Sequence, residues 1–419
     1  MTQPTKPLAG MRVLEGSAFV ACPSGGMTLA QLGADVIRFD AIGGGIDYKR
    51  WPLTPEGHSL YWQGLNKAKR SIQVNLRSRG GQEIITQLAT APGPDAGIFI
   101  TNFPTVGWLS YEALSQHRKD LIMVAITGNH DGTTAVDYTV NCAMGYPWLT
   151  GNEGTVNHVL PAWDVICGQT TALGVLAAER QRARSGDGTA VSLALSDVAL
   201  ATVSMLGHIA EAELLGTQRP RIGNDLYGAF GKDFELTDGS RIQIVAVSAR
   251  QWQSIVAACE IQEEVAALET ETGLNFTRSD GDRYQARDEL NGLVASWCAR
   301  RTLTEAQQAL DAQGVCWGRY QSMLDMVAND PRCSVANPLF SQQEHPLTGR
   351  YLPPGSPLRF AQNPSTQNLR ADLPSNLNPT DTLVGSAPSL GQHTDEVLGE
   401  VLGLSATEIG RLHDAGTVA

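Results

Sequence analysis

Short apolar runs alternate with helical segments through the first 130 residues, and this alternation constrains the fold more than any other feature of the chain. The apolar runs have the length and residue types of strands, and segments of about ten residues with helical spacing separate them. Strands joined by such helices pair in parallel, because each connection crosses over one face of the sheet. The sequence therefore predicts an α/β fold with a Rossmann-like large domain.

The expected elements of this domain follow one another regularly. We predict strands over residues 11–15, 34–40, 96–101, 121–127 and 189–195. We predict helices over residues 27–32, 80–89, 111–117 and 165–184, and small residues at 23–26 open the first of them. The apolar stretch at residues 191–215 contains Asp197, His208 and Glu211, so it indicates a buried strand and helix rather than a membrane span.

The pattern changes near Tyr227, which indicates a second, smaller α+β domain. Residues 234–247 predict a hairpin that turns at Asp238 and Gly239, and amphipathic helices follow to about residue 313. Pro and Asn then accumulate at residues 329–379, a composition typical of an extended connection with little regular structure. A capped helix pair is expected over residues 394–412.

Charge is unevenly distributed along the chain. The net charge of -12 argues against a nucleic-acid binder, which needs a broad basic surface. Residues 38–79 nevertheless contain eight basic residues against three acidic ones, a local net of +5. Two segments, 47–51 and 66–71, suit a phosphate-bearing ligand, and we expect both to follow strands at the edge where such folds bind ligands. The alternative is a solvated loop surface.

Several common functions lack their motifs here. No G-x-G-x-x-G, G-x-x-x-x-G-K-[ST] or G-x-S-x-G occurs at a strand-to-helix turn, which disfavours dinucleotide-dependent dehydrogenases and α/β-hydrolases. The seven cysteines form no C-x-x-C pair, so we expect reduced, mostly buried thiols in a cytosolic enzyme. The histidines lack ligand spacing, and no metal site is expected. Residues 1–8 show no secretory signal.

Asp164 stands where the helix at 165–184 begins. A helix N-cap is the ordinary role for an aspartate at such a position. The same position favours an ionised carboxylate and offers backbone N–H groups to an oxyanion, so Asp164 could also be a nucleophile that attacks an acyl carbon. Periodicity does not choose between the two roles.

Motifs spread along the chain resemble the class III CoA-transferase family of the CaiB–BaiF type. They occur in the order in which the family has them. The matching segments are residues 7–14 (PLAGMRVL), 32–37 (LGADVI), 66–71 (NKAKRS), 101–103 (TNF), 176–178 (LAA), 186–188 (GDG), 227–230 (YGAF) and 390–394 (LGQHT). Any one of them is a weak signal, but together and in register they are strong.

The resemblance implies an acyl-CoA substrate and a homodimer of two interlocked open-ring subunits in the cytoplasm. It implies no cofactor beyond the CoA moiety of the substrate and no nucleic-acid, membrane or metal partner. Residues 1–200 would form the first part of a large CoA-binding domain, 201–223 a linker, 224–318 the small domain, 319–380 a linker and return segment, and 381–419 the helices that complete the large domain.

The resemblance also assigns candidate site residues. Asp164 aligns with the catalytic aspartate of the family. The CoA contacts of the family fall on Val20, Ala21, Val74, Arg77, Asn102 and Phe103. One departure is that the family often has Asn-Phe-x-Pro-Gly with an Arg shortly after it, and the segment after Phe103 lacks that Arg.

Four segments resemble a narrower branch of the family that moves CoA between the two carboxyl groups of one mesaconate molecule. They are residues 15–21, 43–51, 157–164 and 227–234. His158 and Tyr138 are candidates for holding the free acid. The alternatives are an intermolecular CoA-transferase and a non-catalytic CoA-binding protein. The racemase branch uses a Gly-His-Asp motif, and the corresponding residues 135–138 contain no His.

Overall fold

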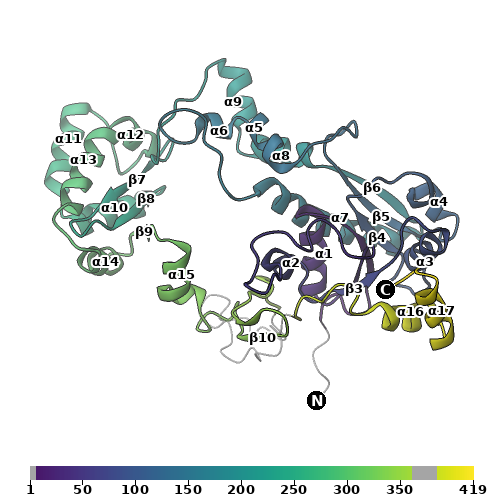
Figure 1. Ribbon diagram of the computed structural model, residues 1–419. Coiled ribbons are helices and arrows are strands. Elements are labelled where there is room, and N and C mark those ends of the chain that lie inside the picture. Colours follow the sequence, from purple (N-terminus) through teal and green to yellow (C-terminus); the bar gives the residue numbers. More distant parts are fainter. Residues whose placement is uncertain (1–5, 361–384) are drawn as a thin grey trace. The chain divides into compact units, whose positions relative to one another are not determined.

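A parallel six-stranded sheet organises the first of two units in the chain (Figure 1). The computed structural model describes residues 6–360 and 385–419. The strand order is β3-β2-β1-β4-β5-β6, and every neighbouring pair is parallel. This order places a reversal of winding between β1 and β4, the position at which open α/β sheets bind ligands. The predicted α/β, Rossmann-like fold is confirmed.

The first unit comprises residues 1–144, 158–214 and 331–419. Its sheet contains β1 (Arg12–Gly16), β2 (Asp35–Asp40), β3 (Arg70–Gln73), β4 (Ile98–Thr101), β5 (Ile122–Thr127) and β6 (Thr189–Ala194). Its longer helices are α1 (Ala21–Gln31), α3 (Arg79–Ala89), α7 (Ala162–Ser185), α8 (Leu195–Met205), α9 (His208–Leu215), α16 (Thr394–Leu402) and α17 (Ala406–Asp414). The shorter elements are α2 (Leu60–Leu65), η1 (Gly107–Leu109), α4 (Tyr111–Ser115), α5 (Asp137–Ala143), η2 (Pro331–Cys333), β10 (Gln343–His345) and β11 (Gly349–Tyr351).

Helices cover both faces of the sheet. α1 and α7 pack together and lie against the central strands, whereas α3 and α16 cover the other face. Leu14, Phe39 and Phe99 are buried beneath the second pair of helices, together with Val397 of α16. The end of the chain also joins the sheet edge, because Val418 bridges Val74 (Figure 1). Residues close to the C-terminus therefore complete the unit that the N-terminus begins.

Helix α1 begins six residues earlier than predicted, at Ala21. Pro23 lies in the first turn, where a missing N–H costs no helical hydrogen bond. Gly25 and Gly26 lie inside the helix rather than before it. A Cβ on Gly25 would lie 2.9 Å from the carbonyl oxygen of Gly168 in α7, and one on Gly26 would lie 1.7 Å from Glu15 Oε2. These small residues therefore permit close packing and do not mark the start of the helix.

The other differences from the prediction concern short or exposed elements. β3 and α2 were not predicted, because each is only a few residues long. β10 and β11 form a hairpin in the stretch at 329–379 that was expected to lack regular structure, and the part of this stretch at 361–379 lies outside the described residues. The stretch at 191–215 forms a strand followed by two helices. It was expected to be buried, and this expectation is wrong for α9, which contains no buried residue.

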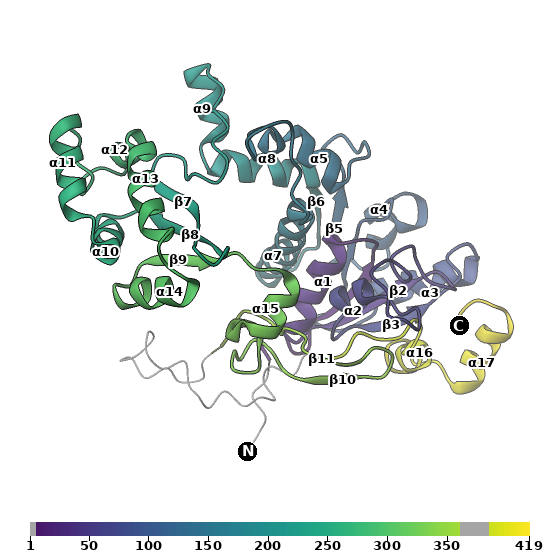
Figure 2. The same cartoon turned by 60° about the vertical axis from the view of Figure 1, so that its left-hand side comes forward.

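The second unit comprises residues 145–157 and 215–330. An antiparallel sheet of β7 (Phe230–Glu235), β8 (Arg241–Ala246) and β9 (Cys316–Arg319) packs against its helices (Figure 2). The turn at Asp238 and Gly239 is confirmed, since the Leu236 N–H donates to Ser240 O. The helices are α6 (Tyr146–Leu149), α10 (Ala249–Cys259), α11 (Gln262–Thr272), α12 (Asp280–Gln285), α13 (Arg287–Cys298), α14 (Leu303–Ala312) and α15 (Met323–Asn329). Three buried aromatic side chains, Trp252, Phe276 and Trp297, belong to its core.

No single helix among the described residues is long and apolar enough to span a membrane. Helices α8 and α9 reach the required length and composition only as a pair, and they are bent by 69°. All seven cysteines are free, and four of them are buried. The expectation that most of the cysteines are buried is confirmed.

Candidate active site

Four of the predicted CoA contacts lie at the reversal point of the sheet. Val20 and Ala21 stand where the loop after β1 enters α1, and Asn102 and Phe103 follow β4 directly. The Asn102 side chain clamps the first loop, because its Oδ1 accepts from the Ala18 N–H at 2.9 Å and its Nδ2 donates to Ala18 O at 2.8 Å. The structure therefore holds the two loops together at the edge where ligands bind in such sheets.

The other two predicted CoA contacts follow β3 at the same edge of the sheet. Val74 is buried, and its N–H donates to Asp40 O. Arg77 is exposed, and its backbone N–H donates to the Asn75 side chain. All six predicted contacts thus come after the carboxyl ends of three strands, and Arg77 supplies a free positive charge at the surface.

Asp164 occupies the third position of α7, not its N-cap. The helix begins at Ala162, three residues before the predicted start, so the N-cap interpretation is wrong. A different aspartate caps this end, since the Asp164 backbone N–H donates to Asp137 Oδ2 at 3.0 Å. Asp137 is buried at the first position of α5, and its other carboxylate oxygen has no partner in the described part of the chain. The carboxyl group of Asp164 is thereby left available for chemistry.

The surroundings of Asp164 disfavour its ionised form. Burial and, secondarily, the negative charge of Asp137 raise the pKa of Asp164 to about 7. Burial and the Asp164 charge raise the pKa of Cys167, one turn further along α7, to about 12, so this thiol stays neutral. A carboxyl group with a raised pKa is a stronger nucleophile once ionised, and such shifts are typical of functional sites.

Asp164 lies close to the loop that carries Val20 and Ala21. Gly168 follows Asp164 by one helical turn, on the same side of α7. A Cβ on Gly168 would lie 2.7 Å from Ala21 O. The predicted nucleophile therefore lies one helical turn from the point where α7 packs against Ala21, one of the predicted CoA contacts.

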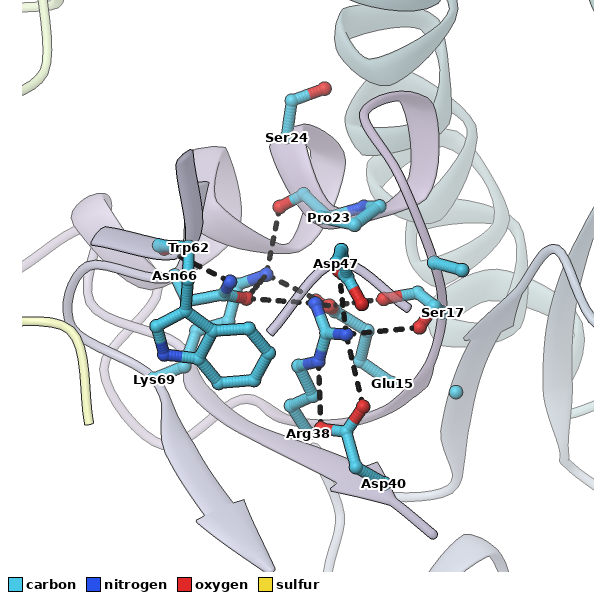
Figure 3. A network of polar contacts seen from close by, with 12 residues as sticks. Glu15, Ser17, Pro23, Ser24, Arg38, Asp40, Asp47, Trp62, Asn66 and Lys69 are labelled. Atoms are coloured by element: carbon cyan, nitrogen blue, oxygen red, sulfur yellow. Dashed lines mark hydrogen bonds and ion pairs between the residues drawn. The ribbon is translucent and has the colours of Figure 1, made fainter. Parts of the chain in front are cut away.

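A buried polar network lies beneath these loops (Figure 3). Arg38 of β2 donates to both carboxylate oxygens of Asp40 at 3.0 Å and to Asp47 Oδ2 at 2.9 Å. Its guanidinium also donates to Ser17 O at 3.1 Å, and its carbon lies 4.4 Å from the ring centroid of Trp62. Although burial alone would lower the pKa of Arg38, the surrounding carboxylates raise it. Arg38 thus joins the loop after β1, the loop after β2 and helix α2.

Lys69 is the second cation of this network (Figure 3). Its Nζ donates to Glu15 Oε1 and Pro23 O at 2.8 Å, and to Asn66 Oδ1 at 3.0 Å. Arg70 instead pairs with Asp35, Glu396 and Glu400, and Lys67 is buried. Residues 66–71 also lead into β3 rather than following a strand. Of the three cations in the segment that was predicted to bind phosphate or to lie in solvent, Lys69 and Arg70 are therefore held in ion pairs and Lys67 is buried.

Three side chains form a cluster above the network, which we call the Arg50 cluster: Phe19, Arg50 and Tyr61. The guanidinium carbon of Arg50 lies 5.5 Å from the ring centroid of Phe19 and 5.2 Å from that of Tyr61. Burial, the largest effect, raises the pKa of Tyr61 to about 12, and the charges of Arg50 and Asp164 also act on its hydroxyl. Tyr61 thus feels both the charge of Arg50 and the charge of Asp164.

Arg50 belongs to the segment 47–51 that was predicted to suit a phosphate-bearing ligand, and Phe19 to a segment that resembles the narrower branch, but the sequence did not reveal Asp137 or Tyr61 as parts of this site. Ser59, a helix-capping residue before an apolar run, was the one local signal for α2, which carries Tyr61. Of the two candidates for holding a free acid, Tyr138 is half exposed and acts electrostatically on Tyr61. The buried Nδ1 of His158 has no hydrogen-bond partner in the described part of the chain.

Comparison with known proteins decides the family. The model of CoA-transferase family III matches residues 8–394. This chain belongs to CoA-transferase family III. The predicted family is confirmed. The 2-methylfumaryl-CoA isomerase of Chloroflexus aurantiacus is 53% identical to the chain and covers 98% of both sequences.

More distant relatives share the family and the fold. The formyl-CoA:oxalate CoA-transferase of Rhodopseudomonas palustris is 27% identical over 99% of this chain and 98% of its own length. A crystal structure of a CAIB/BAIF family protein from Brucella suis superimposes with a TM-score of 0.73 at 23% identity, and it covers 95% of this chain and 100% of that one. The sheet and its flanking helices are therefore the family fold.

Proposed function

We propose that this protein converts 2-methylfumaryl-CoA (mesaconyl-C1-CoA) to 3-methylfumaryl-CoA (mesaconyl-C4-CoA) by moving CoA between the two carboxyl groups of one mesaconate molecule. The observation that carries the proposal is the 53% identity, over 98% of both chains, to a 2-methylfumaryl-CoA isomerase. The site supports it with a poised carboxyl group, Asp164, beside the loops that hold the predicted CoA contacts.

The first half of the reaction frees mesaconate. The Asp164 carboxylate attacks the C1 thioester carbonyl, and CoA thiolate leaves, which gives an aspartyl–mesaconyl anhydride. The thiolate then attacks the aspartyl carbonyl, and mesaconate leaves as a carboxylate. The protein now carries CoA as a thioester on Asp164. Two such steps replace one difficult exchange between a carboxylate and a thioester.

The second half reverses these steps at the other end of the acid. Mesaconate turns and attacks the aspartyl thioester with its C4 carboxylate, so that CoA thiolate leaves and a new anhydride forms. The thiolate attacks the C4 carbonyl, which releases Asp164 and gives the isomer. Strictly internal transfer requires a site that retains the free dicarboxylate while it turns.

The function is tested by incubating purified protein with mesaconyl-C1-CoA in the presence of isotope-labelled free mesaconate. We expect the C4 isomer to form without label. Formation of labelled product would instead indicate transfer between separate acids, as the name of the Rhodopseudomonas palustris relative describes for that protein. CoA binding without any isomer would indicate a non-catalytic CoA-binding protein.

The raised pKa of Asp164 predicts how activity depends on pH. Because the ionised carboxylate reacts, kcat/KM should rise with pH through an apparent pKa near 7. Asp137→Asn removes a negative charge but keeps an oxygen that can accept from the Asp164 N–H. In this variant the apparent pKa of the kcat/KM profile should fall by about one unit. It should stay above the ordinary range of a carboxyl pKa, because Asp164 remains buried.

The matched control for this prediction is Asp187→Asn, which removes an exposed aspartate beyond the far end of α7. Its rising limb should coincide with that of the wild type. A limb that stays in place or moves to higher pH in Asp137→Asn would contradict the electrostatic account.

We also propose that the protein is a homodimer of interlocked subunits and resides in the cytoplasm. Helices α9 and α15 each lack a buried residue, and large apolar side chains are exposed on or beside them: Met205, Leu206, Leu214, Met323 and Leu324. Such surface is typical of residues that a partner covers. Sedimentation should give about twice the 44.8 kDa chain mass. The free thiols support a reducing compartment, and no cofactor beyond the CoA moiety is required.

A further inference from the structure

We propose that Arg50 binds the free carboxylate of the dicarboxylic acyl group, and so forms a carboxylate subsite beside Asp164. This inference rests on the proposed function and names the group that retains the acid. Phe19 and Tyr61 complete the subsite as its apolar walls. The argument begins from the charge of the site, because Asp137 and Asp164 would repel a second carboxylate unless a cation offset them.

Arg50 differs from three other cations within residues 38–79. Arg38, Lys69 and Arg70 are all paired with carboxylates inside the protein. Within residues 6–360 and 385–419, by contrast, no hydrogen bond or ion pair engages the guanidinium of Arg50. Its five N–H donors are therefore available to a ligand. A carboxylate is the group that their forked geometry fits best, through two parallel hydrogen bonds.

The position of Arg50 favours the acyl group over the phosphates of CoA. The guanidinium carbon of Arg50 lies 5.2 Å from the ring centroid of Tyr61, and the charge of Asp164 acts on the hydroxyl of the same side chain, so Tyr61 is a neighbour of both groups. The atoms of an acyl-CoA that must reach the nucleophile are the thioester and the acyl chain. In mesaconyl-CoA the one anionic group on that chain is the second carboxylate. Arg77 lies elsewhere, after β3, and is free for the CoA phosphates.

Hydrogen bonds hold the backbone at or near all three members of the Arg50 cluster. Arg38 holds Ser17 and Asp47, which precede Phe19 and Arg50 by two and three residues. Ser59 Oγ donates to Arg50 O at 2.5 Å and also caps α2, which carries Tyr61. Phe19 has a φ of 65°, a left-handed conformation that is strained for a residue with a side chain. Such strain is characteristic of functional sites, and here it holds the Phe19 ring beside the guanidinium.

A substrate pair tests the subsite separately from the chemistry at Asp164. Mesaconyl-C1-CoA contains the second carboxylate, whereas crotonyl-CoA lacks it. Both can form the covalent adduct at Asp164, which hydroxylamine traps as an aspartyl hydroxamate and mass spectrometry detects. In Arg50→Gln, kcat/KM for isomerisation should fall about 10- to 100-fold, because a charge-assisted hydrogen-bonded pair is lost. Trapping with crotonyl-CoA should change by less than about threefold.

Arg50→Gln should also allow free mesaconate to leave the active site and exchange with mesaconate in solution. Isotope-labelled mesaconate, excluded from the product by the wild type, should enter the product of Arg50→Gln. Arg50→Lys should recover part of the isomerisation rate, because it restores the charge without the fork. Arg180→Gln, the same change at an exposed position of α7, is the matched control and should behave as the wild type in every assay.

Two results would overturn the subsite: an equal loss with both CoA esters, which indicates a structural role, or no loss with either. Failure of the proposed function gives a different result. In that case the wild type forms no C4 isomer. The subsite proposal is then supported if Arg50→Gln reduces trapping with mesaconyl-C1-CoA more than trapping with crotonyl-CoA. It is contradicted if both CoA esters are affected equally.

Discussion

Replacement of Asp164 by alanine or asparagine is expected to abolish isomerisation, with a loss of at least about 10⁴-fold in kcat. Every bond that forms or breaks in the proposed reaction involves this carboxyl group or the CoA sulfur. Asparagine keeps the shape of the side chain but cannot carry CoA as a thioester. Retention of even a few per cent of the activity in a purified variant, free of wild-type protein, would contradict the mechanism.

The same variants should remain folded. The side chain of Asp164 makes no hydrogen bond or ion pair in the described part of the chain, and Asp137 rather than Asp164 caps the start of α7. A raised carboxyl pKa means that the native state binds a proton more tightly than the unfolded state does, so the group destabilises the fold progressively between about pH 4 and pH 7, and the full penalty applies above pH 7. The melting temperature of Asp164→Asn at pH 8 should therefore equal or exceed that of the wild type. A large decrease would show that the lost activity reflects misfolding.

Replacement of Arg38 by methionine is expected to cause the largest loss of stability. The change leaves Asp40, Asp47 and Glu15 buried with their charges uncompensated by the guanidinium. Removing one partner from a buried ion pair costs about 3–5 kcal/mol, since the remaining charge stays out of water. Denaturant unfolding of the variant and the wild type at pH 7 measures this difference directly.

Arg79→Met is the matched control for Arg38→Met. Arg79 forms an ion pair with Glu83 on α3, but its side chain is 93% exposed, and such pairs contribute little. The control should change the free energy of unfolding by less than about 0.5 kcal/mol. If Arg38→Met destabilised the protein no more than Arg79→Met does, the network would not be what fixes the loops after β1 and β2.

The parallel sheet was predictable because its strands are continuous apolar runs with helices between them. An element that is long enough shows this periodicity in its own sequence and can therefore be predicted. β3 has only four residues, and α2 only six, so neither produced a pattern. The start of α1 was misplaced for a different reason. Gly25 and Gly26 are required by contacts with α7 and Glu15, and these residues lie outside the stretch of sequence that forms α1.

The site was predictable only in part. Asp164 and the six CoA contacts came from motifs that the family shares, and in the structure Gly168, one turn after Asp164, packs against Ala21. The buried network was not predictable, because Glu15, Arg38, Asp47 and Lys69 come from four segments that meet only on folding. In the sequence these charges resemble an exposed basic surface. Their pairing removes Arg38 and Lys69 from that surface, whereas the guanidinium of Arg50 has no ion-pair partner in the described part of the chain.

Trapping of the covalent intermediate tests the central claim most directly. Purified protein is mixed with mesaconyl-C1-CoA and then with hydroxylamine, and the peptide that contains Asp164 is analysed by mass spectrometry. The proposed mechanism predicts an aspartyl hydroxamate at Asp164 that requires the CoA ester and is absent from Asp164→Asn. Full turnover with no modification at Asp164, or modification at Asp137 in its place, would contradict it.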